Sequence, residues 1–256
     1  EPWPPLMIAW RGLERRLLAR AGTVAVSSPA YAQASPALAS FLSKVRTIPL
    51  GLDPERLPQP TAEATARARA LWPEQELRVL AVGRLSHYKG YEVLLKALAQ
   101  VPEAALVLAG EGEERAALER LLGELGLTGR VRLVGRVDDD LLTGLYAACD
   151  LFCLPSLNRA EAFGVVLLEA MHAGKPCLVT DIPGSGPAWV VRHGETGLVA
   201  PPGDAAALAK ALKELAGEPD LRERLGAGGR RRFGEHFHID ALARQWRKAY
   251  GEAGGG

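Results

Sequence analysis

The chain has 256 residues, of which 48% are hydrophobic and 24% charged, so it holds enough apolar material for one large domain with a true core, and general disorder is excluded. Its 31 Lys and Arg nearly balance 30 Asp and Glu, and a net charge of +1 excludes a global field that recruits nucleic acid or an anionic bilayer. No apolar run reaches the roughly 18 to 20 residues of a membrane span, and no stretch reads as a signal peptide.

The first 50 residues combine a helical pattern, a strand at 23–28, a helix near 37–44 and a strand at 45–50. Because the chain opens within what reads as a helix, we expect a fragment, with residues 1–50 as the remnant of a second α/β domain. Segment 51–76, which contains "GLDPERLPQPTAEAT", is proline-rich and polar and is predicted to be a linker.

From residue 77 to residue 216, short Val- and Leu-rich runs alternate with amphipathic helical patterns. This alternation predicts βαβ units and therefore an α/β fold, a doubly wound, Rossmann-like parallel sheet with helices on both faces. Two helical patterns follow at 217–250, and residues 251–256 are predicted to be a flexible tail. The predicted strands are 77–83, 104–110, 131–135, 151–156, 176–181 and 197–201, and the helices between them are 91–100, 113–126, 139–149, 164–173 and 204–217.

The three cysteines, Cys149, Cys153 and Cys177, lie in apolar surroundings without CxxC spacing. This pattern argues against a disulfide framework or a structural zinc site and favours a reducing, cytoplasmic setting. We expect no metal site and no cofactor.

Ligands of doubly wound folds bind in the loops at the carboxyl ends of the strands. In "VGRLSHYKGYEVLL", Arg84 and Lys89 flank a turn and Gly90 opens the next helix. A helix N-terminus and two cations together suit an anion such as a diphosphate. The alternative for the two cations is that they are solvated loop residues.

The stretch "EAFGVVLLEAMHAGKP" places Glu161 in a loop and Glu169 inside the helix predicted at 164–173. Five residues of helix rise about 7.5 Å, so the two carboxylates are predicted to act as separate clamps. Carboxylates accept hydrogen bonds from vicinal sugar hydroxyls, and Gly164 and Val165 offer backbone N–H groups between them. The loops together suit a nucleotide-activated sugar.

These motifs resemble those of the retaining glycosyltransferases of family 4, which have the two-domain GT-B fold. The two glutamates, with "AFGVVLL" between them, match the paired-Glu signature of that family, and "GRLSHYKG" matches its "GRL…KG" loop. The resemblance covers nearly all of residues 77–216 and points to the C-terminal, nucleotide-sugar-binding domain. The Gly-rich loop, the histidine and the acceptor site that the N-terminal domain supplies in this family are not found, so that domain is expected to be largely missing.

The resemblance also implies a role for each residue. Arg84 and Lys89 would hold the donor diphosphate, and Glu169 would bind the ribose hydroxyls. Glu161 would contact hydroxyls of the transferred sugar. Arg84, Lys89 and Glu161 are thus the implied catalytic residues of a front-face substitution, in which charge builds on the leaving diphosphate. The further implied donor contacts are the backbones of Phe163, Gly164 and Val165 and, beside the base, Val137.

The expected function is hexosyl transfer with retention, from a UDP-, GDP- or dTDP-sugar to a glycan or lipid-linked acceptor, in polysaccharide, lipopolysaccharide or glycolipid synthesis. The chain itself is expected to be a donor-binding fragment, cytoplasmic, with any peripheral contact at the inner face of the cell membrane made by the missing domain. The alternatives are a non-catalytic nucleotide-sugar-binding module and a GT-B-like sugar-nucleotide epimerase. A nicotinamide dehydrogenase is disfavoured because no GxGxxG follows the first long strand.

Overall fold

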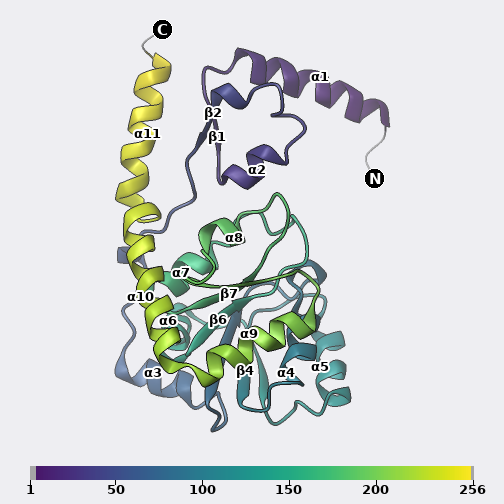
Figure 1. Cartoon of the computed structure of the whole chain (residues 1–256), viewed down its shortest axis with the longest axis vertical. Coiled ribbons are helices and arrows are strands. Elements are labelled where there is room, and N and C mark those ends of the chain that lie inside the picture. Colours follow the sequence, from purple (N-terminus) through teal and green to yellow (C-terminus); the bar gives the residue numbers. More distant parts are fainter. Residues whose placement is uncertain (1–3, 255–256) are drawn as a thin grey trace.

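The structure, a computed structural model, describes residues 4–254 and contains two parallel sheets. The larger has 6 strands in the order β5-β4-β3-β6-β7-β8 and carries helices on both faces (Figure 1). The predicted doubly wound α/β fold is therefore confirmed. The winding reverses between β3 and β6, the topological switch point at which such folds bind ligands. The strands are β3 Leu77–Val82, β4 Ala104–Ala109, β5 Val131–Gly135, β6 Leu151–Leu154, β7 Cys177–Thr180 and β8 Gly197–Ala200.

The helices Asp139–Ala148 and Ala205–Gly217 each begin after an aspartate whose side chain caps the first turn. Asp138 accepts a hydrogen bond from the Leu141 backbone at 2.8 Å, and Asp204 accepts one from the Ala207 backbone at 2.9 Å. None of the helices among residues 4–254 is long and apolar enough to cross a membrane. The helices are α4 Tyr91–Leu98, α5 Arg115–Glu124, α6 Asp139–Ala148, α7 Val166–His172, α8 Pro187–Val190, α9 Ala205–Gly217, α10 Pro219–His236 and α11 Ile239–Gly254.

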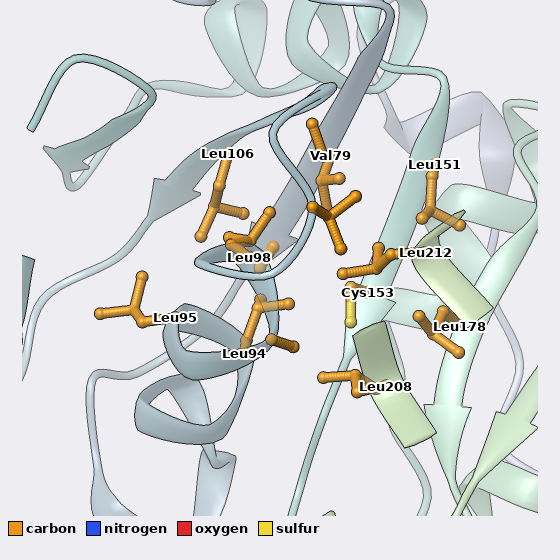
Figure 2. Packing of buried hydrophobic residues seen from close by; sticks show 14 of the residues in the cluster. Val79, Leu94, Leu95, Leu98, Leu106, Leu151, Cys153, Leu178, Leu208 and Leu212 are labelled. Carbon is orange, nitrogen blue, oxygen red and sulfur yellow. The ribbon is translucent and has the colours of Figure 1, made fainter. Parts of the chain in front are cut away.

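The core lies on both faces of the large sheet, because alternate residues of a strand point to opposite sides. Figure 2 shows one face, where Val79 and Leu106 of the strands meet Leu94 of α4 and Leu212 of α9. The other face lies under α6, α7 and α10, and its buried strand residues include Leu80, Val107, Phe152 and Val179. Strands buried on both faces explain the uninterrupted apolar runs of the sequence.

The N-terminal unit contains α1 (Pro4–Arg20), β1 (Val24–Val26), α2 (Pro29–Gln33) and β2 (Val45–Thr47). Both predicted strands are present, and they pair in parallel. The prediction of a helix near 37–44 is wrong, because this segment forms turns that end in the 3-10 turn Leu42–Lys44. So short a segment gains little as an isolated helix. The turns instead bring the Lys44 ammonium to the end of α1, where it donates to the Ala19 and Ala21 carbonyls at 2.6 and 2.9 Å.

Segment 51–76 is more ordered than a linker. Helix α3 (Ala62–Arg69) begins after Thr61, whose hydroxyl oxygen accepts from the Ala64 backbone at 3.0 Å. Ala64 is fully buried against α6, and the indole of Trp72 donates to the Val79 carbonyl at 3.0 Å. The polar, alanine-rich composition does not predict this helix, since its buried side chains are alanines. At the other end, α11 continues into the predicted tail as far as Gly254, and residues 255–256 lie outside the described residues.

Candidate functional site

The two loops singled out in the sequence follow β3 and β6, which are neighbours in the sheet. Both loops therefore lie at the carboxyl edge of the switch point. They are joined directly, since the Leu157 backbone donates to the Tyr88 carbonyl at 2.8 Å. Gly90 permits this approach, because it has a φ of 70° and a Cβ there would lie 2.1 Å from the Pro155 carbonyl oxygen.

Lys89 and Glu161 form a buried ion pair at the centre of the two loops. The Lys89 Nζ lies 2.6 Å from Glu161 Oε2, and the two side chains are only 10% and 9% exposed. Ser156 donates to the same carboxylate oxygen at 3.1 Å, and the Ser185 hydroxyl donates to the Glu161 carbonyl. The sequence predicts an ammonium facing a helix N-terminus, whereas the structure turns it toward a carboxylate. Lys89, which is expected to bind phosphate, thus lies next to Glu161, which is expected to bind the sugar.

Arg84 lies at the rim of the site. Its side chain is 70% exposed and forms an ion pair with Glu113 at 3.2 Å. Within residues 4–254, neither Lys89 nor Glu161 is in hydrogen-bonding contact with it. Any anion that Arg84 binds must therefore extend from the buried pair toward solvent.

The turn before α7 presents backbone donors, as the sequence predicts. Gly164 has a φ of 79°, a left-handed conformation that favours glycine. Among the described residues, no atom accepts a hydrogen bond from the N–H groups of Phe163, Gly164 or Val165. The Phe163 ring packs near the rings of Trp189 and Phe237, at 6.5 and 6.2 Å between centroids. Only the backbone of Phe163 is therefore available to a ligand.

Glu169 lies apart from the buried pair, on the side of α7 that faces α6. Tyr146 donates to Glu169 Oε2 at 2.7 Å. Burial raises the pKa of Glu169, and the hydrogen bond from Tyr146 opposes that rise. Both side chains line a cavity of about 210 Å³ between α6, α7 and segment 57–60. Val137 is half-buried in the loop between β5 and α6, next to the cap of α6.

Sequence reasoning missed Ser156, Ser185 and Tyr146. Ser156 has a detectable signal, because it directly follows a buried strand at the edge where ligands bind. Tyr146 has no such signal, since it lies at a core-facing position of a helix and reads as packing. Among residues 4–254, no group of three His, Cys, Asp or Glu side chains is placed to hold a metal ion.

The site can hold an anionic group beside a hydroxyl-rich one. Lys89, Arg84 and the free N–H groups of the α7 turn are anion donors, and Glu161 is an acceptor for hydroxyls. A site of this composition contributes to a reaction by position and charge.

Comparison with known proteins places these features in a family. The model of "Glycosyl transferases group 1" matches residues 63–232. D-rhamnosyltransferase WbpZ of Pseudomonas aeruginosa is 35% identical over 233 residues, which are 91% of this chain and 60% of that protein. O-antigen chain mannosyltransferase C of Escherichia coli is 32% identical over 239 residues, 93% of this chain and 62% of that protein. The chain thus spans about three fifths of the length of these curated relatives.

Solved structures agree on the fold. Anabaena Alr3699/HepE in complex with UDP-glucose matches with a TM-score of 0.80 at 25% identity, over 94% of this chain and 67% of that one.

Proposed function

This chain belongs to the group 1 glycosyl transferases, and we propose that it is the donor-binding half of a glycosyltransferase that moves a sugar from a nucleotide-diphosphate sugar to an acceptor hydroxyl. Its relatives include a rhamnosyltransferase and an O-antigen mannosyltransferase, and the matching Anabaena structure holds UDP-glucose. The acceptor class that fits these relatives is a glycan or lipid-linked glycan of polysaccharide, lipopolysaccharide or glycolipid synthesis.

The observation that carries the proposal is the contact of 2.6 Å between Lys89 and Glu161 at the switch point. In a nucleotide-diphosphate sugar, the outer phosphate is bonded to the anomeric carbon, so phosphate oxygens and ring hydroxyls lie close together. An ammonium beside a carboxylate is complementary to that junction. A buried ion pair is also weak evidence for stability, because desolvation offsets much of the attraction. Under this proposal, the pair serves ligand recognition.

The proposed mechanism is that of the retaining family 4 enzymes. As the bond between sugar and phosphate breaks, Lys89 and Arg84 stabilise the negative charge on the leaving diphosphate. Glu161 holds hydroxyls of the sugar, and the acceptor hydroxyl attacks from the face that the diphosphate leaves. Ribose would lie on Glu169 and the base near Val137.

We propose that the donor is bound without a metal ion. Lys89, Arg84 and the free N–H groups of Gly164 and Val165 would donate hydrogen bonds to the phosphate oxygens that a divalent cation would otherwise contact. Donor binding, measured by calorimetry, is expected to be the same with and without EDTA. Loss of binding in EDTA would contradict this part of the proposal.

The curated relatives are longer than this chain. We assign the acceptor site to an N-terminal domain of the full-length protein. The same domain would make any peripheral contact with the inner, cytoplasmic face of the cell membrane.

The proposal is tested by calorimetric titration with UDP-glucose, UDP-N-acetylglucosamine, GDP-mannose and dTDP-rhamnose. For the nucleotide sugar that binds, Glu161→Gln should lower the affinity for that nucleotide sugar. The same substitution should leave the affinity for the free nucleoside diphosphate unchanged. Lys89→Ala should weaken the nucleoside diphosphate far more than the nucleoside. Lys96→Ala, which removes an exposed ammonium paired with Glu92 on α4, is the control and should change neither. Equal losses for every ligand would contradict the assignment.

A further inference from the structure

Tyr146 is a buried tyrosine whose hydroxyl has a charged partner. The residue is 4% exposed, its ring packs against Phe152 with centroids 5.7 Å apart, and its hydroxyl donates to Glu169 Oε2 at 2.7 Å. The Val166 carbonyl oxygen lies farther from the hydroxyl, at 3.4 Å. A hydroxyl has one proton to donate, so the shorter contact identifies the carboxylate as its acceptor.

This contact leaves one side of the carboxylate open. Among the described residues, no group donates a hydrogen bond to the second oxygen, Glu169 Oε1. A carboxylate on a helix can rotate about its side-chain bonds, and holding one oxygen fixes the direction of the other. The rigidity comes from Tyr146, since α6 and the buried ring position its hydroxyl.

We propose that Tyr146 is a positioning residue of the nucleotide site, whose hydroxyl holds Glu169 so that its free oxygen accepts hydrogen bonds from the vicinal hydroxyls of a ribose. The inference rests on the proposed function, in which Glu169 is the ribose clamp. It adds that the clamp needs a second residue, from a different helix, to be aimed.

The groups around Glu169 make this role testable by pH. Burial and the charge of Glu169 hold the pKa of Tyr146 well above its ordinary value, so the phenol remains a donor while the carboxylate titrates. Asp139 on α6 adds to the rise of the Glu169 pKa, whereas the Tyr146 hydrogen bond opposes it. Among the described residues that line this cavity, His172 of α7 and Arg230 of α10 are the other titratable or charged groups. Removing the Tyr146 hydroxyl therefore raises the Glu169 pKa further.

The experiment compares binding of UDP and GDP with binding of their 2′,3′-dideoxy analogues to the intact chain, between pH 4.5 and 8. In the unchanged protein, the nucleotide that binds should be preferred over its dideoxy analogue by about tenfold or more, the range of a charged hydrogen bond. Glu169→Gln should lower this preference at neutral pH and remove its pH dependence. Tyr146→Phe should lower it by about fivefold, leave the dideoxy affinity unchanged, and move the acidic loss of preference to higher pH.

Tyr91→Phe is the matched control. Tyr91 is 2% exposed, and its hydroxyl has no hydrogen-bond partner among the described residues. The Tyr91→Phe substitution removes an equally buried phenol oxygen, from α4. It should change neither the preference for the nucleotide over its dideoxy analogue nor the pH midpoint of that preference.

The outcomes separate the two proposals. If Tyr146→Phe keeps the preference and pH midpoint of the unchanged protein while Glu169→Gln lowers the preference, the positioning role is overturned and the ribose clamp stands. If Tyr146→Phe weakens nucleotide and dideoxy analogue equally, its role is structural and the inference is likewise overturned. If the unchanged protein shows no preference, or binds neither UDP nor GDP, the assignment of Glu169 to the ribose fails, and the role of Tyr146 fails with it.

Discussion

At the residue scale, Lys89 and Glu161 are buried because each neutralises the other. A lone buried charge costs several kcal/mol, and replacing both charges removes that cost along with the attraction. Ser156 satisfies part of the carboxylate, but it carries no charge. Removing one partner of the pair is therefore expected to destabilise the protein. The intact pair is complementary to a ligand that carries both charge and hydroxyls.

Lys89→Met, which keeps most of the apolar stem, should lower the free energy of unfolding by about 3 to 5 kcal/mol, because it leaves the Glu161 carboxylate buried without a cation. Adding Glu161→Gln should restore most of this loss, as measured by urea denaturation. Lys96→Met breaks a pair whose side chains are 49% and 50% exposed and should cost less than about 1 kcal/mol. A double variant no more stable than Lys89→Met alone would refute this view of the pair.

Glu169 makes stability depend on pH in the opposite sense to a salt-bridged acid. Its folded-state pKa is raised by burial, so its favourable contribution is present below the unfolded pKa of about 4.3 and is lost as pH rises through the folded pKa. Glu169→Gln should thus gain stability relative to the unchanged protein between pH 4 and pH 7. Urea midpoints at both pH values measure this, and a difference that does not grow with pH would count against it.

At the element scale, α3 belongs to the layer that contains α6. A Cβ added at Gly144 of α6 would lie 2.5 Å from the Ala64 carbonyl oxygen of α3, a backbone atom that yields only if the helices separate. This close backbone contact explains why segment 51–76, predicted to be a linker, is instead part of the fold.

Gly144→Ala should therefore destabilise the chain by about 1 to 3 kcal/mol, as overpacking does. Gly123→Ala is the control on α5, where an added Cβ meets nothing within 4 Å, and it should be neutral or stabilise by up to about 1 kcal/mol through helix propensity. Thermal or urea unfolding of both variants checks the difference. If Gly144→Ala proves as stable as Gly123→Ala, α3 does not pack on α6 as described.

The strands of the large sheet can be predicted from the sequence more readily than helix α3 and the turns at 37–44. The inner strands of the large sheet are predictable, because strands buried on both faces need nearly continuous apolar runs. The edge strand β5, whose Arg132 is exposed, is predicted from its place in the alternation of strands and helices. Helix α3 is not predictable, since its buried face consists of alanines that composition does not distinguish from a polar linker. The turns at 37–44 depend on where Lys44 finds its acceptors on α1. A contact such as Lys89 with Glu161, 72 positions apart, depends on strand order, which local patterns do not specify.

At the scale of the whole molecule, the loop that follows β6 contacts the N-terminal unit. The Arg159 guanidinium, two positions before Glu161, donates to the Ala34 carbonyl of that unit at 3.3 Å and lies 5.5 Å from the Tyr31 ring. The chain crosses between the units twice, and the two crossings are hydrogen-bonded, since Leu52 donates to the Phe237 carbonyl at 3.0 Å. Figure 1 shows α11 continuing from this crossing beside the N-terminal unit.

Under the proposed function, this chain binds a donor, and transfer of the sugar needs an acceptor-side domain as well. The buried pair would fix the pose of the donor, but transfer also requires an oriented acceptor and a cleft that excludes water. The most direct test incubates the chain with radiolabelled nucleotide sugars and a mixed acceptor pool, and measures binding and transfer in the same samples. We predict saturable binding at about 10 µM to 1 mM without labelled product. Labelled product from this chain alone, or no binding of any donor at 1 mM, would contradict the claim.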